Sequence, residues 1–337
     1  MLKILIGRIL TTIPALIGVV VVSFLLTRVL PGDTAAYFAG PAATPQAIEE
    51  VRKKLGLDRP LPEQFASYVR DLSHGNLGQS LTTGQPVLSD IKARLPASAE
   101  LTLFGLVLSL LIAVPLGIVA AVRQGSMIDH ACRAIVTAGV SLPVFFTGLL
   151  LVYVFYFILQ ISPAPLGRLD VFASAPAEIT GFYLLDSLLA RDGATFRASF
   201  SQLLLPGVTL AIFALAPIAR ITRASMLSVL SMDFVRTARA SGLSRRKVIM
   251  TYAFRNALLP VVTTLGMVFS FLLGANVLVE KVFAWPGIGS YAVEALIASD
   301  FAPVQGFVLA MAILYIVLNL LIDLSYRLID PRMRASS

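Results

Sequence analysis

The sequence predicts an all-α polytopic membrane protein with six transmembrane helices. Of its 337 residues, 57% are apolar and only 14% are charged, against roughly 45–50% and about 25% in soluble domains. The apolar residues gather in six stretches, each close to the length at which a helix crosses a bilayer. The single cysteine, Cys132, excludes a disulfide framework and a multi-cysteine metal site. The two histidines leave almost no material for a His-rich metal site or proton relay.

The six predicted spans cover residues 9–26, 101–122, 135–159, 203–221, 258–279 and 307–324. The first span follows Lys3 and Arg8, as the apolar region of a secretory signal would. Its apolar stretch exceeds the roughly 7–15 residues of such a signal, and no small-residue cleavage site follows it directly. We therefore expect a retained membrane anchor.

The distribution of charge predicts the orientation. If the N-terminus is cytoplasmic, the inside segments hold 15 basic and 4 acidic residues, and the remaining segments hold 12 basic and 15 acidic residues. Basic residues accumulate on the cytoplasmic side of membrane proteins. Both termini are therefore expected inside, and the net charge of +8 requires no nucleic-acid partner.

This topology predicts four segments: the N-terminus and first span (1–30), an extracytoplasmic region (31–98), a core of five spans (99–326) and a cytoplasmic tail (327–337). In region 31–98, Thr44 as N-cap, Pro45 at the first position and Gly56 as a stop predict one helix. A second amphipathic stretch runs from Pro60 to Leu72. The region either packs on the bundle as a lid or docks a soluble partner. Loop 160–202 carries no structural prediction beyond its extracytoplasmic side.

The span interiors carry essentially no ionisable residue, whereas proton-driven or sodium-driven transporters usually place such groups at mid-membrane. Arg220 and Asp323 lie near span ends, where interfacial pairing or capping explains them better than a role in a pathway.

Small residues recur every four positions in two spans, which lets another helix approach closely. They are Gly105, Ser109, Ala113 and Gly117 in the second span, and Gly266, Ser270 and Gly274 in the fifth. Four prolines within or near spans predict kinks or breaks: Pro115, Pro143, Pro206 and Pro217.

No catalytic constellation is present. The sequence has no Gly-Lys pair and hence no phosphate-binding loop, no His-Glu-x-x-His pair and no Gly-x-Ser-x-Gly elbow. His74 is an isolated loop residue, and Asp129 and His130 form a short-loop pair. If the protein moves a solute uphill, another subunit must supply the energy.

The cytoplasmic loop 222–257 is the place for that subunit. Residues 233–247 read Asp-Phe-Val-Arg-Thr-Ala-Arg-Ala-Ser-Gly-Leu-Ser-Arg-Arg-Lys. They predict a short helix, a turn at Gly242 and a second helix that leads into the fifth span. The preference of basic residues for the cytoplasmic side explains part of the positive charge of this loop. The small residues Ala238, Ala240 and Gly242 suit close docking into a groove of another protein.

This segment resembles the coupling loop, the Glu-Ala-Ala motif, of permeases from ATP-binding-cassette (ABC) importers. Residues 236–243 (Arg-Thr-Ala-Arg-Ala-Ser-Gly-Leu) and 255–260 (Arg-Asn-Ala-Leu-Leu-Pro) match the variant of the dipeptide/oligopeptide/nickel group. Arg236 begins the triplet that replaces Glu-Ala-Ala, and Gly242 matches the glycine of the motif. Arg255 departs from the general motif, as it does throughout that group.

The resemblance covers nearly the whole chain, and loop 160–202 is its least recognisable part. The other matching stretches, in family order, are 31–33 (Pro-Gly-Asp), 55–60 (Leu-Gly-Leu-Asp-Arg-Pro), 76–80 (Asn-Leu-Gly-Gln-Ser), 94–96 (Arg-Leu-Pro), 141–145 (Ser-Leu-Pro-Val-Phe), 279–283 (Val-Glu-Lys-Val-Phe), 285–289 (Trp-Pro-Gly-Ile-Gly) and 330–332 (Asp-Pro-Arg).

The resemblance implies a type I ABC importer permease fold in the bacterial inner membrane, with no cofactor bound by this chain. Its implied partners are a second homologous permease subunit, two cytoplasmic ATPases that hold ATP and Mg, an extracytoplasmic solute-binding protein and membrane lipid. The expected ATPase-coupling residues are Asp233, Arg236, Thr237, Ala238, Arg239, Ala240, Gly242, Leu243, Arg255 and Asn256.

The group imports dipeptides, oligopeptides, nickel chelates, glutathione and other small solutes, and peptide is the expected substrate from its frequency in the group. Two other classes are disfavoured. An ion-coupled carrier acting alone lacks mid-membrane charges, and a membrane enzyme lacks a catalytic constellation.

Overall fold

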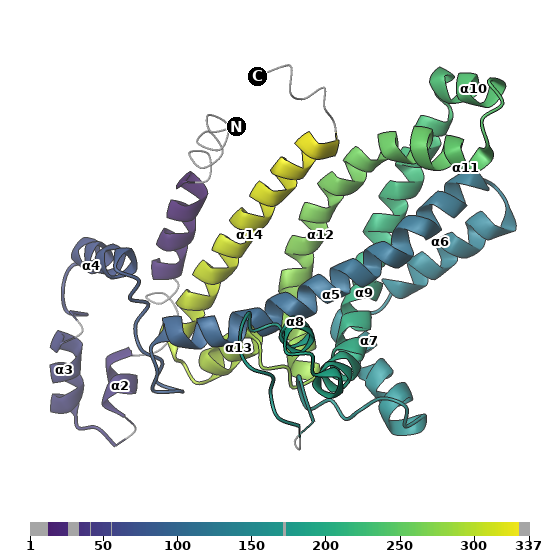
Figure 1. Cartoon of the computed structure of the whole chain (residues 1–337). Coiled ribbons are helices and arrows are strands. Elements are labelled where there is room, and N and C mark those ends of the chain that lie inside the picture. The colour runs from purple at the N-terminus through teal and green to yellow at the C-terminus, as the bar shows by residue number, and fades with distance from the viewer. Residues whose placement is uncertain (1–12, 26–33, 41, 55, 171–172, 330–337) are drawn as a thin grey trace. The chain divides into compact units, whose positions relative to one another are not determined.

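The computed structural model describes residues 13–25, 34–40, 42–54, 56–170 and 173–329. Residues 9–12 and 26 of the predicted first span, the stretch 31–33, Leu55 and the tail 330–337 lie outside these ranges. Within them every regular element is a helix, and the one isolated β-bridge pairs Gln79 with Pro86. The all-helical fold class is thus confirmed (Figure 1).

The chain divides into two compact units. The first contains Met1–Pro96 and Pro286–Val317, and the second contains Ala97–Trp285 and Leu318–Ser337. The long helices α5 (Val87–Val122) and α14 (Phe301–Ile329) contribute residues to both units.

Four helices in the described residues are long and apolar enough to cross a membrane: Val87–Val122, Gly193–Leu230, Arg245–Val282 and Phe301–Ile322. A fifth span is possible as the bent pair Met127–Gly139 and Val144–Ile158, and Ile13–Leu25 is a shorter apolar helix inside the predicted first span. Six spans are compatible with this arrangement. The helices extend beyond the predicted apolar stretches because polar residues continue the same backbone hydrogen bonding past the apolar core.

The third predicted span is not one straight helix. Helices α6 (Met127–Gly139) and α7 (Val144–Leu151) meet at 97°. Pro143 is the N-cap of α7, and proline disfavours a helical residue before it, which explains the break. No such break occurs at Pro115 in α5 or at Pro206 and Pro217 in α9 (Gly193–Leu230), so the expectation of a break fails there.

In the first unit, the two predicted helices are present as α3 (Pro45–Lys54) and α4 (Leu61–Ser73). The Thr44 hydroxyl accepts the Ala47 N–H at 3.3 Å, and Gly56 has a φ of +65°. A short helix, α2 (Thr34–Ala39), was not predicted.

Asp300 is a buried anchor of the first unit. Its carboxylate accepts the Ser80 hydroxyl at 2.8 Å and the Leu81 N–H at 2.7 Å. The hydroxyl of Tyr291, in α13 (Ile288–Ile297), donates to Asp90 at 2.8 Å. The segment before α5 is therefore bonded to the α13–α14 connection, and the first turn of α5 is bonded to α13.

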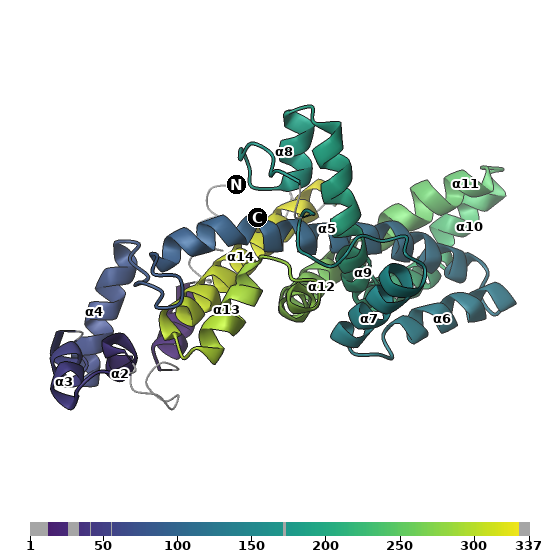
Figure 2. The same cartoon turned by 90° about the horizontal axis from the view of Figure 1, so that it is seen from below.

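In the second unit, α9 and α12 (Arg255–Val282) lie side by side (Figures 1 and 2). A buried polar cluster ties the far end of α12 to the part of α5 in the same unit. Ser98 donates to Glu280 at 2.5 Å, Asn276 donates to Glu280 at 2.9 Å, and the Trp285 indole donates to the Ala97 carbonyl at 2.9 Å. The core of this unit is thus held at the end opposite the α9–α10 connection.

Candidate functional site

The predicted helix, glycine turn and second helix of loop 222–257 are present. Helix α10 covers Asp233–Ala240, with an acidic residue in its first turn and Arg239 in its last, which suits the helix dipole. The second helix is continuous through α11 (Arg245–Lys247), the π-helical segment η2 (Val248–Phe254) and α12. Figure 1 shows α10 and α11 together at one end of α9 and α12. We call α10 with residues 241–247 the projection.

Gly242 reverses the chain after α10. Its φ is +76°, in the left-handed region that glycine adopts without a steric cost. Its N–H donates to the Arg239 carbonyl at 3.0 Å, and no atom of the residues that the structure describes lies within 4 Å of a Cβ built on it. The turn therefore needs glycine for its backbone, and the space beside it is open.

One hydrophobic cluster attaches the projection to the bundle. It joins residues of α5, α9, α10, η2 and α12, and its buried members are Ala121, Met226, Val229, Val235, Ala238, Val248, Ala253 and Ala257. Val235 is fully buried, and Leu243 packs on the cluster from the turn. A displacement of α10 must therefore move the ends of three long helices, since packed interiors transmit strain.

This cluster corrects one expectation. Ala238 was expected to face a partner's groove, but its exposed fraction is only 6% and it packs inside the projection. The helical period explains the difference: Val235 and Ala238 are three residues apart and share the inner face of α10. Ala240 and Gly242 are exposed, as expected.

The projection and the residue before it, Met232, expose both basic and apolar side chains. Phe234 and Met232 have exposed fractions of 40% and 45%. Asp233 and Arg236 form a 3.3 Å pair that is almost fully solvated, so it contributes little to stability. Beside them, an open pocket of about 410 Å³ is lined by Val122, Leu230, Arg239, Leu243, Arg245, Val248 and Ile249.

The remaining candidate coupling residues make local contacts. The Thr237 hydroxyl donates to the Asp233 carbonyl at 3.1 Å within α10. Arg255 and Asn256 are exposed at the start of α12, and the Asn256 amide donates to the Tyr252 carbonyl at 2.7 Å. They lie beyond η2, and the structure does not bring them into the projection.

The small-residue stripe of the second span faces α9. A Cβ on Gly105 would lie 2.7 Å from the Leu210 Cβ, and one on Gly117 would lie 2.6 Å from the Thr222 Cβ. Ser109 and Ala113, between them, are fully buried.

The second stripe is only partly occupied. A Cβ on Gly266 would lie 2.8 Å from Ile322 Cδ1, whereas nothing in the described residues lies within 4 Å of one on Gly274. Ser270 is half-buried and donates to the Gly266 carbonyl at 2.9 Å, within its own helix.

The sequence analysis missed two buried ion pairs. Arg223 donates to both oxygens of Asp129, at 2.8 and 2.7 Å, and so joins α9 to α6. Arg168 donates to Glu100 at 2.6 Å and lies over the Tyr183 ring. The sequence carries no signal for either pair, because the partners are far apart in the chain. A single charged residue in the sequence is equally consistent with a solvated loop position and with a buried ion pair.

Loop 160–202 also contains an ordered carboxylate. Asp186, in α8 (Tyr183–Leu189), accepts the Thr180 hydroxyl at 2.7 Å and the Gly181 N–H at 2.9 Å. Burial opposes ionisation, but these bonds and those from the Ile179 and Thr180 N–H groups outweigh it, so the pKa of Asp186 is below its usual value. With the Arg168 pair, this bond network fixes the loop to α5.

Comparison with known proteins identifies the family. The model of "Binding-protein-dependent transport system inner membrane component" matches residues 113–335, and the model of the N-terminal part of such membrane components matches residues 1–102. The chain belongs to this family, the membrane permease subunits of ABC importers, as the predicted coupling loop indicated.

Named relatives match over nearly their full lengths. The chain is 45% identical to "Probable D,D-dipeptide transport system permease protein DdpB" of Escherichia coli, over 94% of this chain and 92% of that one. It is 39% identical to the di/tripeptide transport system permease protein DppB of Pseudomonas aeruginosa, over 99% of both chains.

A solved structure of the inward-facing MetNI methionine ABC transporter contains a similar chain. The TM-score is 0.51 at 17% identity, over 70% of this chain and 93% of that chain. At that identity the likeness concerns the fold. Its family membership and its apolar helices make the protein a multi-pass transport subunit of the bacterial inner membrane.

Proposed function

We propose that this chain forms half of the translocation pathway of an ATP-driven importer of dipeptides or short oligopeptides. The two relatives described above are peptide permeases by name. The coupling role is supported by the position of the projection. One face of it is exposed, and its inner face packs on the ends of α5, α9 and α12.

In this proposal a cytoplasmic ATPase holds the projection in a cleft. Phe234 and Met232 supply its apolar contact, and the surrounding arginines and Lys247 supply charge complementarity. ATP and Mg bind to the ATPase and not to this chain. When two ATPases close on ATP, α10 moves with them, and the hydrophobic cluster passes the motion to the spans. This is a rigid element with two positions, biased by nucleotide.

The same proposal assigns the remaining partners. A second, homologous permease subunit completes the pathway, and an extracytoplasmic solute-binding protein delivers the peptide. Both termini are cytoplasmic. The exposed stripe of α12, with Met267 at 64% and Phe271 at 61% beside the open Gly274, is available to that second subunit or to lipid.

The test is peptide uptake and binding-protein-stimulated ATP hydrolysis by the importer reconstituted in proteoliposomes. Gly242→Trp should abolish both activities, because the added side chain projects into open space that only a partner would fill. Gly242→Asn should retain most activity, because asparagine tolerates a positive φ better than other residues with a Cβ.

A second pair of variants separates docking from folding. Phe234→Ala should lower stimulated ATP hydrolysis severalfold, whereas Phe157→Ala, which removes an aromatic ring 67% exposed in the segment η1 (Val152–Ile158), should not. Normal uptake by the Gly242→Trp variant would contradict the coupling role. If the importer took up a nickel chelate or glutathione and no peptide, the coupling role would stand and the proposed substrate would be wrong.

A further inference from the structure

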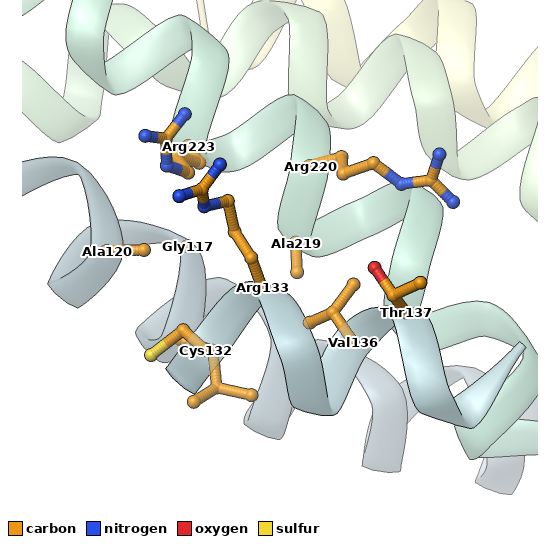
Figure 3. Close-up of a pocket in the computed structure, with 10 residues that line it drawn as sticks. Gly117, Ala120, Cys132, Arg133, Val136, Thr137, Ala219, Arg220 and Arg223 are labelled. Atoms are coloured by element: carbon orange, nitrogen blue, oxygen red, sulfur yellow. The ribbon is translucent and has the colours of Figure 1, made fainter. Parts of the chain in front are cut away.

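A small pocket lies between α5, α6 and α9, apart from the projection. Its volume is about 110 Å³, and it is lined by Leu116, Gly117, Ala120, Cys132, Arg133, Val136, Thr137, Ala219, Arg220 and Arg223. Six of these ten residues are apolar or lack a side chain, one is a threonine and three are arginines. Figure 3 shows Arg133 and Arg223 converging at one side of the pocket while Arg220 extends in another direction from α9.

The arginines outnumber their counter-charges. Arg223 pairs with Asp129 through two hydrogen bonds, and Arg133 makes only a 3.5 Å contact with the same carboxylate. Arg133 also donates to Nδ1 of His130 at 2.6 Å, which gives it a neutral partner. Arg220 was expected to pair or cap at the interface, but its side chain has no hydrogen bond or ion pair within the described residues. Within the described residues, the Asp129 carboxylate therefore contacts two of the three guanidinium groups and leaves Arg220 without a counter-charge.

Arg220, unpaired within the described part of the chain, lies in the last third of α9. Residue 220 precedes the end of α9, at residue 230, by ten residues, or roughly 15 Å at 1.5 Å per residue. The same end of α9 leads into the projection, where basic residues gather. Arg133 is 50% exposed, so its guanidinium is accessible from outside the bundle.

The pocket is too small for a peptide. Ligand pockets usually measure about 300–1,000 Å³, and about 110 Å³ accommodates a few methylene groups or waters. An apolar recess with cationic groups at its mouth instead matches the start of an acyl chain joined to a phosphate. Basic pockets between transmembrane helices on the cytoplasmic side are known to bind anionic headgroups.

We propose that this pocket binds an anionic phospholipid, with the exposed side chains of Arg220 and Arg133 attracting the negatively charged headgroup and the recess at Ala120, Val136 and Ala219 holding the first part of an acyl chain. The lipid supplies the charge that the chain lacks and joins α6 to α9 beside the Asp129–Arg223 pair. The proposal does not depend on the transported substrate.

The test is native mass spectrometry of the full-length protein, with the subunits that copurify, titrated with phosphatidylglycerol or phosphatidylcholine. The wild-type chain should retain phosphatidylglycerol in preference to phosphatidylcholine. Arg220→Gln and Arg133→Gln should each weaken phosphatidylglycerol binding about fivefold, since one cation near the membrane surface contributes about 1 kcal/mol. Arg220→Lys should retain most of the binding.

The matched control is Arg197→Gln, which removes the same charge from an exposed position at the other end of α9 and should leave binding unchanged. If the variants do not fold, the wild-type protein remains decisive, because phosphatidylglycerol and not phosphatidylcholine should raise its Tm. Equal binding of the two lipids, equal loss in the control, or displacement of the lipid by inorganic phosphate or a dipeptide would overturn the proposal.

Discussion

At Asp129, one carboxylate joins two helices that are far apart in the sequence. Its exposed fraction is 1%, and it accepts two hydrogen bonds from Arg223 and one from the Gly125 N–H at 3.1 Å. A buried charge is tolerated only when it is paired and hydrogen-bonded in this way. The pair holds the N-terminal turn of α6 against α9, close to the projection, so one residue sets the position of a helix.

Asp129→Asn should lower the free energy of unfolding by about 1–3 kcal/mol, because Arg223 loses its counter-charge in a partly buried site. Arg223 is 24% exposed, so water compensates part of the loss. The measurement is thermal unfolding of the purified protein in detergent.

The control is Asp233→Asn, which breaks an exposed pair on α10 and should cost less than about 1 kcal/mol. Equal Tm values for the two variants would show that the Asp129 pair does not hold α6 to α9.

At the scale of elements, small residues decide which helix faces come together. Gly105 and Gly117 allow α9 to approach α5, and van der Waals packing drives such association in a membrane. Proline acts differently in different elements. Pro143 marks a 97° bend because it opens a new helix, whereas Pro206 lies inside α9 without ending it. Neighbouring helices can compensate for a missing hydrogen bond inside a bundle.

The glycine contacts predict opposite effects of one substitution at two positions. Gly117→Ala should lower the free energy of unfolding by about 1–3 kcal/mol, because its Cβ would lie 2.6 Å from the Thr222 Cβ and 2.9 Å from the Ala219 carbonyl oxygen. Gly274→Ala should be neutral or stabilising by up to about 1 kcal/mol, because alanine favours the helix and no described atom lies within 4 Å of the added Cβ. Thermal unfolding of both variants in the same detergent compares them, and a Gly117→Ala protein as stable as the wild type would contradict close α5–α9 packing.

At the scale of the whole molecule, the basic residues are concentrated in the projection. The projection carries five basic residues and one acidic residue in positions 233–247, whereas loop 160–202 is held by carboxylates that pair inside the protein. Positive charge is retained on the cytoplasmic side. The projection and both termini are therefore proposed to be cytoplasmic, and loop 160–202 extracytoplasmic.

Cysteine labelling tests that orientation. In a Cys132→Ala background, Ser241→Cys and Glu178→Cys place single thiols at exposed positions of the projection and the loop. A membrane-impermeant maleimide added to intact spheroplasts should label only Glu178→Cys, and permeabilisation should expose Ser241→Cys. The reverse pattern would invert the topology, and labelling of the background protein itself should be negligible.

Much of the local structure could be predicted from the sequence. Thr44, Pro45 and Gly56 mark a helix in the first unit, and Gly242 marks the turn of the projection. These signals are local, because a cap or a turn depends on residues a few positions apart. The bend before Pro143 and the inward position of Ala238 could not be decided from the sequence, because both depend on how the neighbouring helices pack. The residues around Pro143 also fit a straight span, and Ala238 also fits a docking face.

The sequence by itself determined the helical membrane class, the positions of the apolar stretches and the family, because composition, length and short motifs carry those properties. Only the tertiary structure decided which charges are paired and which are left over. Asp129 and Arg223 are 94 residues apart, and Glu100 and Arg168 are 68 apart. A pairing across that separation depends on how the helices pack, and so does the surplus of positive charge that it leaves at Arg220.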